Sequence, residues 1–530
     1  MRDATFEVFR RRGLTTLFAN PGSTEVPFLT DLPDDLRFVL ALHEGSVVGM
    51  ATGWAIARRE PALVILHTTA GLGNAVGALA TARVNRAPLV VLVGQQDRRH
   101  LSFEPFLAGK LRGLAGDYPV WVDEPVRPQD VPGAVGRAWH EATTARGPAL
   151  VIVPMDDWSA EAGYPYEEAA AVRVVLGLAP EEGAIDDLVE LLAGAAAPAL
   201  VVGAGAADAE SWSALVTLAE RLACPVWQES FGARAGFPQD HPHFAGHLPA
   251  DRTRLRETLA PHDVVLVVGA PALRQYPYEP GPFVEEGTRL AVVSQDPSEV
   301  HRSPGHVAVL ASPAAVCTEL ARRVPPREAS PLVPLERPAP PAPPLPGEPL
   351  RAGHLLAALA ERLPADAVLI EETPSNRPEL HARVPARSPL GFLSAAMGGL
   401  GFALPAATGV KMAEPGRPVV AVVGDGSSLY GIQALWSAAQ YRVGVLFVIL
   451  ANGGYAVMDR LAERQGGASP WPGFAVDITG LAGSFGCPAQ RIDDHATLLQ
   501  TLDDVLPELA SRGEPLLLEV VVTPDETFAP

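Results

Sequence analysis

The segment from Val419 to Tyr455 constrains the fold more than any other part of the chain. It opens with the valine-rich run Val419–Val423, which predicts a buried strand, and continues with apolar residues at three- and four-residue spacing, which predict a helix. The apolar run Val443–Leu450 then predicts a second strand. This order predicts a βαβ unit in a parallel sheet, and such sheets bind ligands at the carboxyl ends of their strands.

Polar residues follow both predicted strands. Gly424, Asp425, Gly426 and Ser427 follow the first, and Asn452 follows the second. Asp425 and Asn452 offer the oxygen ligands that suit Mg²⁺, which takes few protein ligands and fills its other positions with phosphate oxygens. Ser427 is expected to open the helix, whose amino end favours an anion. The Gly-Asp-Gly turn alone fits an ordinary loop in which Asp425 caps a helix, but Asn452 favours a metal that holds a diphosphate.

Length and composition indicate a multidomain α/β protein. At 530 residues the chain is too long for one ordinary core, and 48% of it is hydrophobic. The formal net charge of −20 argues against a nucleic-acid partner, because phosphate backbones are bound by basic surfaces. An anionic cofactor must therefore be held by a metal and backbone amides.

The location expected from the sequence is the cytoplasm. Cys224, Cys317 and Cys487 lie far apart and cannot all pair, which favours a reducing compartment. The amino-terminal segment has no signal-peptide core, and no apolar run is long enough to cross a membrane. We therefore expect no membrane partner.

Alternating strands and helices predict three α/β domains with doubly wound parallel sheets. We expect them at residues 1–165, 180–324 and 350–530, with the proline-rich segment 325–349 as a stiff linker. In the middle domain, the run 203–205 (Gly-Ala-Gly) matches half of a dinucleotide fingerprint, but its third glycine position is an aspartate, so a structural turn is favoured.

The first domain also places polar residues after several predicted strands. Glu44 follows the strand Phe38–Leu42 at the start of a buried helix, and His67 follows the strand Leu63–Leu66. The other residues at these strand ends are Asn20, Pro21, Gly22, Ser23, Gly73 and Asn74. The carboxyl ends of these strands are expected to meet at one crevice.

Together these motifs resemble the fingerprint of the thiamin-diphosphate-dependent enzymes, in which Gly-Asp-Gly is followed after about two dozen residues by a pair of asparagines. Here the first of the pair is Ala451 and the second is Asn452. The resemblance covers almost the whole chain and implies pyrimidine-binding, central and diphosphate-binding domains in that order. It also implies that Asp425, Asn452 and the main-chain carbonyl of Gly454 hold Mg²⁺.

The resemblance implies that Glu44 protonates the far nitrogen of the cofactor's pyrimidine ring. The plainer interpretation is a first-turn glutamate that the helix dipole favours, and the fingerprint at Asp425 favours the catalytic one. Gly398 would accept a hydrogen bond from the pyrimidine amino group, and Leu400 would bend the cofactor. The cofactor-binding residues implied in this way are Asn20, Pro21, Gly22, Glu44, Gly73, Asn74, Thr373, Ser375, Gly398, Leu400, Gly424, Asp425, Gly426, Ser427, Asn452, Gly454 and Tyr455.

Within that family, the motifs are most similar to those of benzoylformate decarboxylases. The likeness implies that Ser23 binds the substrate carboxylate and that His67 is an acid–base group; a plainer interpretation of His67 is a strand-end or helix-capping histidine. Tyr276 stands at the position of a second active-site histidine, and a phenol is a poor proton shuttle at neutral pH. Pro374 replaces a hydroxyl residue expected near the diphosphate. The substrate-pocket residues implied are Phe106, Leu107, Ser394 and Leu461, of which Ser394 and Leu461 replace aromatic residues.

The sequence thus predicts a carbon–carbon lyase that uses thiamin diphosphate and Mg²⁺ to decarboxylate a benzoylformate-like 2-oxo acid to an aldehyde and CO₂. The resemblance also implies a homodimer with shared active sites, assembled as a dimer of dimers. One alternative is a carboligase of the same family that makes acyloins or acetohydroxy acids, which the products would distinguish. Another is a catalytically silent cofactor-binding protein.

Overall fold

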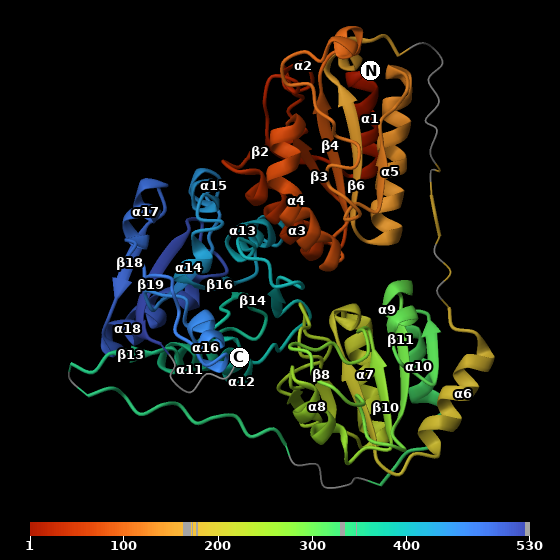
Figure 1. The fold of residues 1–530 in the computed structure, drawn as a ribbon, viewed down its shortest axis with the longest axis vertical. Helices are drawn as coiled ribbons and strands as arrows, with labels where there is room; N and C mark the ends of the chain where they lie inside the picture. The colour runs from red at the N-terminus through yellow and green to blue at the C-terminus, as the bar shows by residue number, and fades with distance from the viewer. Residues whose placement is uncertain are drawn as a thin grey trace.

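The computed structural model describes residues 1–162, 171, 173–175, 177, 179–328, 334–345 and 347–524. Three parallel sheets divide these residues into a first domain, a middle domain and a third domain, each an α/β unit (Figure 1). The predicted fold class is confirmed. The predicted domain limits stay predictions, and residue 165 and part of the segment 325–349 lie outside the described residues.

The first domain is built on a sheet of strand order β2-β1-β3-β4-β6-β5. The strands are parallel, but the order in which the chain adds them to the sheet reverses between β1 and β3. This reversal creates the crevice where such sheets bind ligands. The short edge strand β5 was not expected, because its three residues are only partly buried. The strands are β1 (Thr16–Asn20), β2 (Arg37–Leu40), β3 (Ala62–Leu66), β4 (Leu89–Gln95), β5 (Trp121–Asp123) and β6 (Pro148–Pro154). The helices are α1 (Arg2–Arg12), α2 (Val26–Leu29), α3 (Glu44–Arg58), α4 (Thr68–Val84) and α5 (Val131–Ala145).

The middle domain has the strand order β12-β11-β10-β7-β8-β9 and reverses between β10 and β7. The Gly-Ala-Gly run follows β7 and packs against the loop after β10, where Gly205 N–H donates to the Gly269 carbonyl at 2.7 Å. This packing supports the prediction of a structural turn. The strands are β7 (Pro198–Val202), β8 (Val226–Gln228), β9 (Phe244–His247), β10 (Val264–Val268), β11 (Arg289–Ser294) and β12 (Val307–Leu310). The helices are α6 (Glu182–Ala193), α7 (Ala209–Leu222), α8 (Arg252–Leu259), α9 (Pro297–Arg302) and α10 (Pro313–Arg323).

The third domain has a seven-stranded sheet of order β13-β19-β17-β16-β14-β15, with β18 also paired to β19. The order in which the chain adds strands to this parallel sheet reverses between β14 and β16, beside the Gly-Asp-Gly turn. The strands are β13 (Leu350–Arg351), β14 (Val368–Glu372), β15 (Phe392–Ser394), β16 (Val419–Gly424), β17 (Leu446–Ala451), β18 (Ala489–Ile492) and β19 (Leu516–Thr523). The helices are α11 (Ala352–Arg362), α12 (Arg377–Arg383), α13 (Ala403–Ala413), α14 (Asp425–Ser428), α15 (Ala434–Gln440), α16 (Ala456–Arg464), α17 (Ile478–Ser484) and α18 (His495–Val505).

The helix after the Gly-Asp-Gly turn differs from the prediction. The expected single helix that opens at Ser427 is wrong, because α14 begins at Asp425 and a separate helix, α15, begins at Ala434. Between them the chain turns at Gly431, which passes so close to the loop before α13 that a Cβ there would lie 2.9 Å from the Gly401 carbonyl oxygen.

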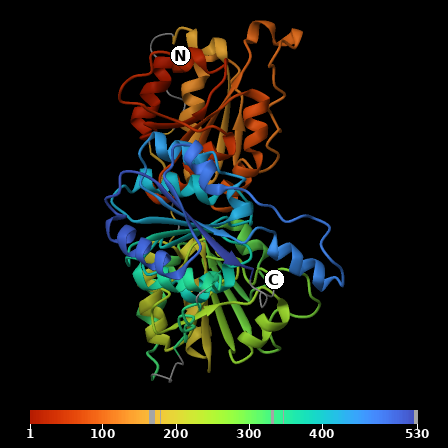
Figure 2. The same ribbon diagram turned by 90° about the vertical axis from the view of Figure 1, so that its left-hand side faces the viewer.

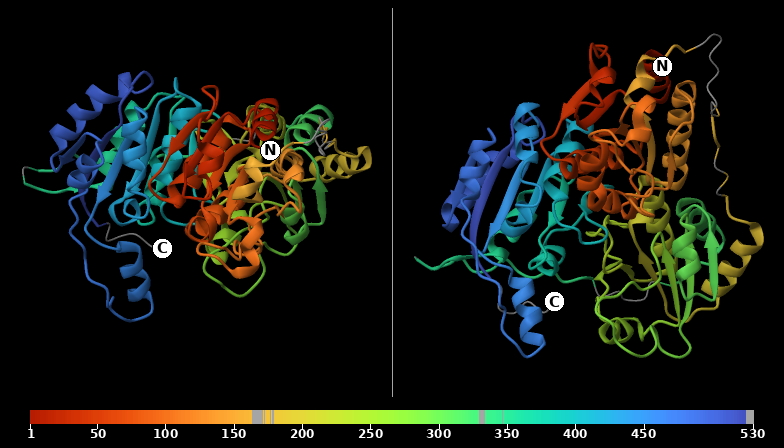
Figure 3. Two further views of the ribbon diagram at one scale, coloured as in Figure 1. Left: turned by 90° about the horizontal axis from the view of Figure 1, so that it is seen from above. Right: turned by 45° about the horizontal axis from the view of Figure 1, so that its top comes forward.

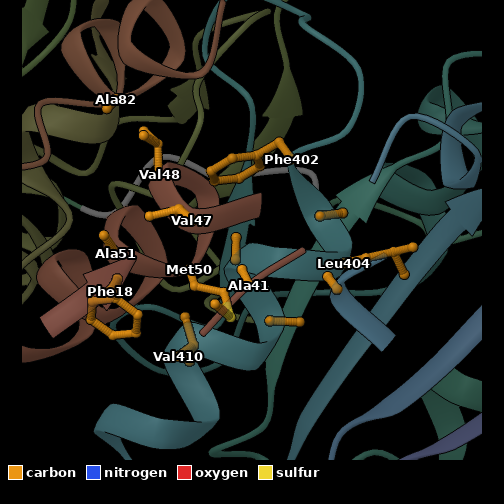
Figure 4. Close-up of a cluster of buried hydrophobic side chains, with 14 of the residues drawn as sticks. Phe18, Ala41, Val47, Val48, Met50, Ala51, Ala82, Phe402, Leu404 and Val410 are labelled. Carbon is orange, nitrogen blue, oxygen red and sulfur yellow. The ribbon is translucent and has the colours of Figure 1, made fainter. Parts of the chain in front are cut away.

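Helices α3 and α13 cross in the core between the first and third domains (Figure 4). A Cβ at Gly53 would lie 2.1 Å from the Ala406 carbonyl oxygen, and one at Gly409 would lie 1.9 Å from the Met50 carbonyl oxygen. Glycine therefore lets the two backbones touch, and apolar side chains of both helices pack around the crossing. This contact sets the first domain against the third (Figure 2).

The proline-rich segment is fixed to the domains that it connects. Arg337 donates from Nη2 to the Gln239 carbonyl at 2.7 Å and from Nη1 to the Ala382 carbonyl at 2.9 Å. Arg383 donates in turn to the Ala339 carbonyl at 3.0 Å. Part of the segment extends away from the domains before it enters the third (Figure 3). Over the described parts of the chain, no helix combines the length and apolar character that crossing a membrane requires.

Candidate active site

A cavity of about 570 Å³ lies at the carboxyl ends of β14, β16 and β17. It includes every third-domain residue that the sequence assigned to the cofactor, although these residues come from four separate segments. The lining residues are Thr373, Pro374, Ser375, Asn376, Gly398, Leu400, Gly424, Asp425, Gly426, Ser427, Tyr430, Leu450, Asn452, Gly454, Tyr455, Val457, Met458 and Trp471.

Asp425 and Asn452 face this cavity from neighbouring strand ends. Asp425 is 6% exposed, and its two carboxylate oxygens accept hydrogen bonds from Gly426 N–H at 2.8 Å and Gly453 N–H at 2.7 Å. Asn452 Oδ1 accepts from Gly454 N–H at 3.1 Å. Burial raises the pKa of Asp425, and the backbone donors act against this shift because they favour the ionised form. The arrangement fixes two hard oxygen ligands side by side.

The wall around Gly426 leaves no room for a side chain. A Cβ there would lie 3.0 Å from the Phe474 ring and 3.1 Å from the Tyr455 ring, and these two rings pack with centroids 5.1 Å apart. Across the cavity, Ser375 Oγ accepts from Val457 N–H at 3.1 Å, so its hydroxyl hydrogen can point to a ligand. Thr373 Oγ1 donates to Glu371 at 2.9 Å.

A buried glutamate that the sequence did not single out holds the loop containing Gly398 and Leu400. Glu372 accepts hydrogen bonds from Gly401, Phe402 and Ala403 N–H at 2.7, 2.8 and 2.6 Å. Burial raises the pKa of Glu372 to about 7 against the pull of these donors. This carboxyl anchors the amino end of α13 and so positions the loop at the cavity. The sequence feature that could have identified Glu372 is an acidic residue at a strand end that precedes a glycine-rich loop.

Glu44 is the first residue of α3 and is 8% exposed. Its Oε1 accepts from Asn20 Nδ2 and its Oε2 from Asn74 Nδ2, both at 3.1 Å. The expectation that Glu44 directly ends a strand is wrong, because β2 stops at Leu40 and a short turn intervenes. The carboxyl is thus oriented by two amides from the first-domain crevice, a tighter arrangement than a first-turn helix glutamate requires.

His67 lies in the same crevice and is paired with Glu25, which the sequence did not single out. Its Nδ1 lies 2.9 Å from Glu25 Oε2 and 3.0 Å from Thr24 Oγ1. Glu25 also accepts from Gly22 N–H at 2.8 Å. His67 precedes α4 but makes no side-chain capping bond, so the capping interpretation fails. A carboxylate that holds Nδ1–H leaves Nε2 available for proton transfer.

Glu25→Gln is expected to lower kcat about 10- to 100-fold and to change KM little. Glutamine keeps an acceptor for the Gly22 amide but loses the charge that orients and stabilises the His67 imidazolium, and a positioned acid–base group contributes about 10²–10⁴-fold. Steady-state kinetics across pH would measure both parameters and the altered pH profile. Glu60→Gln, an exposed glutamate of the same domain, is the matched control. An unchanged kcat and pH profile would contradict the positioning role.

Protein-family models for three domains of thiamine pyrophosphate enzymes match the sequence of this chain. They are the N-terminal TPP binding domain at residues 1–113, the central domain at 185–320 and the C-terminal TPP binding domain at 378–520. A benzoylformate decarboxylase of Pseudomonas aeruginosa is 39% identical over 535 residues, which cover 100% of this chain and 99% of that protein. The chain belongs to the thiamine pyrophosphate enzyme family.

Solved structures of the family agree with this assignment. A thiamine diphosphate-dependent 4-hydroxybenzoylformate decarboxylase of Rhodococcus jostii RHA1 superposes with a TM-score of 0.93 at 37% identity and covers 99% of both chains. A benzoylformate decarboxylase of Polynucleobacter necessarius also gives 0.93, at 33% identity over 100% of this chain and 99% of that one. In sequence alone, a putative acetolactate synthase large subunit of Mycobacterium tuberculosis is also similar, at 29% identity over 96% of each chain. The predicted resemblance to benzoylformate decarboxylases is confirmed.

The cavity fits the cofactor of this family. Asp425 and Asn452 supply hard oxygen atoms for a metal, and the hydroxyl-bearing residues Ser375 and Ser427 line the same cavity. Within the described residues, no three His, Cys, Asp or Glu side chains form a metal-binding group. The proposed Mg²⁺ site does not need such a group, because two of its three protein ligands are the Asn452 amide and the Gly454 carbonyl.

The first-domain residues assigned to the cofactor do not line this cavity. Asn20, Glu44 and Asn74 meet in the first-domain crevice, whereas all lining residues belong to the third domain. The remaining members of this group are Pro21, Gly22 and Gly73. Within one chain the two halves of the predicted site are therefore separate.

The residues assigned to the substrate lie outside the cavity as well. Ser23 is exposed, and Phe106 and Tyr276 are 87% and 59% exposed. Ser394 is buried and its Oγ accepts from Arg377 at 2.5 Å. Leu107 and Leu461 are partly buried. None of these residues lines the cavity, and their roles stay predictions.

Proposed function

We propose that this chain catalyses the non-oxidative decarboxylation of a benzoylformate-like 2-oxo acid to an aldehyde and CO₂, with thiamin diphosphate and Mg²⁺ as cofactors. The observation that carries the proposal is the meeting of Asp425, Asn452 and the Gly398 loop at one cavity in a chain of this family. The full-length likeness to benzoylformate decarboxylases supports the reaction type.

The bound cofactor supplies an electron sink for the carbon–carbon bond that breaks. Asp425, Asn452 and the Gly454 carbonyl would hold Mg²⁺, and Ser375 and Ser427 would bind the diphosphate. Glu44 would hold and release a proton at the pyrimidine ring, oriented by its two asparagine partners. In the proposed reaction, Ser23 binds the substrate carboxylate, and His67 Nε2 exchanges protons with the reacting groups while Glu25 fixes Nδ1.

We further propose a homodimer in which the first domain of one subunit completes the cavity of the other, with two such dimers in a tetramer. The separation of the Glu44 crevice from the third-domain cavity within one chain supports shared sites. A carboligase is the second candidate, favoured by Tyr276 at the position of the second histidine and by the weaker likeness to acetolactate synthases.

The test is CO₂ release and product identification with purified protein, thiamin diphosphate, Mg²⁺ and a panel of aryl and aliphatic 2-oxo acids. We expect stoichiometric CO₂ and free aldehyde, with benzaldehyde from benzoylformate. A coupled hydroxyketone as the main product would establish the carboligase instead. If the protein bound the cofactor but released no CO₂ from any of these acids, the result would favour a catalytically silent cofactor-binding protein.

A further inference from the structure

One buried side chain of the first domain, Asn85, is bonded to the segment that leads into the Gly398 loop of the same chain. Asn85 is 2% exposed and directly follows the last residue of α4. Its Nδ2 donates to the Ser394 carbonyl at 2.8 Å, and its Oδ1 accepts from Ala396 N–H at 2.7 Å. Both distances are those of well-formed hydrogen bonds. The amide therefore pairs with the backbone just after β15 ends, as a neighbouring strand would.

A second residue of α4 contacts the same loop. A Cβ at Gly399 would lie 3.1 Å from Thr81 Oγ1, and this hydroxyl donates to the Gly77 carbonyl at 3.1 Å. Asn85 N–H donates to the Thr81 carbonyl at 2.8 Å, so the two residues are one helical turn apart and share a face of the helix. The carboxyl end of α4 therefore contacts the loop at two points, on both sides of Gly398.

Ser394 is bonded to all three domains, and Asn85 supplies the first-domain contact. The Ser394 N–H donates to the Ala233 carbonyl of the middle domain at 2.9 Å, and its Oγ accepts from Arg377 of the third domain at 2.5 Å. Asn85 binds the remaining polar group, the carbonyl. These contacts fix the end of β15, and the second hydrogen bond of Asn85, to Ala396, fixes the direction in which the chain leaves it.

The first and third domains are held together by other contacts. Helices α3 and α13 cross between them with their backbones touching at Gly53 and Gly409, and apolar side chains surround the crossing. Asn85 and Ala396 belong to neither helix. Apolar packing thus supplies the adhesion between the domains, whereas a buried amide paired in both directions specifies one position of the backbone that it binds.

We propose that Asn85 is a positioning residue that fixes the Gly398 loop at the cofactor cavity of its own chain. The inference rests on the proposed function, in which Gly398 and Leu400 contact the cofactor. It gives the first domain two roles, because the same domain presents Glu44 and His67 to the cavity of the other subunit. Helix α4 begins after His67 and ends before Asn85, so the two roles fall at opposite ends of one helix.

Hydrogen exchange and cofactor binding test the proposal without a measurement of turnover. In full-length Asn85→Ala without cofactor, the amides of residues 394–401 should exchange about tenfold faster than in the wild type, because Ala396 N–H loses its acceptor. The Kd of thiamin diphosphate in saturating Mg²⁺ should rise about tenfold, because the bound position of the loop is no longer preformed.

Gln239→Ala is the matched control. Gln239 is also a buried amide from another domain, and its Oε1 accepts from the third-domain amide of Ala386 at 2.9 Å, but neither residue lines the cavity. This variant should lose Tm as Asn85→Ala does, while loop exchange and the Kd of the cofactor stay within about twofold of the wild type. Equal changes in the two variants would mean that Asn85 only stabilises the fold, and would overturn the proposal.

Mixed dimers locate the effect within one chain. In a heterodimer of Glu44→Gln and Asp425→Asn subunits, the one intact site would combine the cavity of the Glu44→Gln chain with Glu44 of the other chain. Adding Asn85→Ala to the Glu44→Gln chain should lower activity about tenfold or more, and adding it to the Asp425→Asn chain should lower activity less than about twofold. The reverse pattern would mean that Asn85 acts through α4 on His67, and equal losses would mean a general structural role. Either result would overturn the proposal.

Asn85→Asp is the second variant, and it keeps the protein testable if Asn85→Ala does not fold. It fills the same space and retains an acceptor for Ala396 N–H, so it should give the same pattern with smaller changes. Unchanged loop exchange and cofactor affinity in the Asn85 variants would overturn the proposal even if the enzyme were fully active. A wild type that released no CO₂ would count against the proposed function alone, because faster loop exchange and a raised Kd would still support the role of Asn85.

Discussion

Glu44→Gln is expected to lower turnover of the cofactor-loaded enzyme by about 10²–10⁴-fold, which corresponds to about 3–5 kcal/mol of lost transition-state stabilisation. Glutamine keeps the volume of Glu44 and can still accept from one of its asparagine partners, but it cannot donate and recover a proton at the pyrimidine ring. The Kd of thiamin diphosphate should change only a few-fold. Steady-state kinetics and cofactor titration would measure both.

Hydrogen–deuterium exchange at the reactive carbon of the bound cofactor isolates the step that Glu44 serves. Exchange should slow in Glu44→Gln by a factor similar to that for turnover, and the control Glu60→Gln should behave like the wild type, because that glutamate lies at the surface beside Arg58. If Glu44→Gln retained a tenth or more of wild-type turnover, the catalytic assignment would be wrong and the helix-dipole interpretation would stand.

Asp425→Asn is expected to raise the Kd of Mg²⁺ by at least about 100-fold and to abolish decarboxylation at ordinary metal concentrations. The substitution removes the only charged protein ligand of the proposed set and leaves two neutral oxygens. The fold should persist, because an amide oxygen can accept the Gly453 hydrogen bond that the carboxylate accepts now. Metal-dependent cofactor binding, followed by tryptophan fluorescence, would measure the change. Asp493→Asn, which alters an exposed aspartate of the third domain outside the cavity lining, is the control.

Asp425 also predicts the direction in which Mg²⁺ affinity changes with pH. Burial raises the pKa of Asp425 in the metal-free protein, and a protonated carboxyl cannot bind Mg²⁺. Metal affinity should therefore be full at alkaline pH and fall as the pH drops through this raised pKa, at a higher pH than for an ordinary aspartate. The residual affinity of Asp425→Asn should lack this fall. The same pH dependence in both proteins would assign it to another group.

Mixing the two inactive proteins tests the shared site. If the cavity of one subunit is completed by the Glu44 of the other, a heterodimer of Glu44→Gln and Asp425→Asn subunits has one site with both substitutions and one with neither. Co-expression with two purification tags should therefore restore about half of the wild-type activity per heterodimer. No restored activity in a purified heterodimer would mean that each chain builds its own site.

Local patterns were sufficient for much of this protein. The runs that became β10, β11 and β16 are buried on both faces, so their continuous apolar character predicts strands in a parallel sheet. Asp425 and Asn452 follow such strands directly, and parallel pairing brings adjacent strand ends together. The sequence therefore predicted their proximity without knowledge of any long-range contact.

Long-range packing decided the rest. Glu25 immediately precedes the short helix α2, and it acquires a role because β1 and β3 pair and bring His67 beside it. Likewise, the helix after Gly-Asp-Gly is interrupted where the chain, at Gly431, passes close to the Gly401 loop.

What the sequence by itself determined is the set of strands, the parallel sheets and the ligands that follow each strand, since these depend on hydrophobic period and on neighbouring residues. Only the tertiary structure decided which residues from distant segments share an environment. It shows Glu372 bonded to the loop that contains Gly398 and Leu400, and Glu25 paired with His67. Hydrogen bonds act over a few ångströms in space, and their partners here lie up to 42 positions apart in the chain.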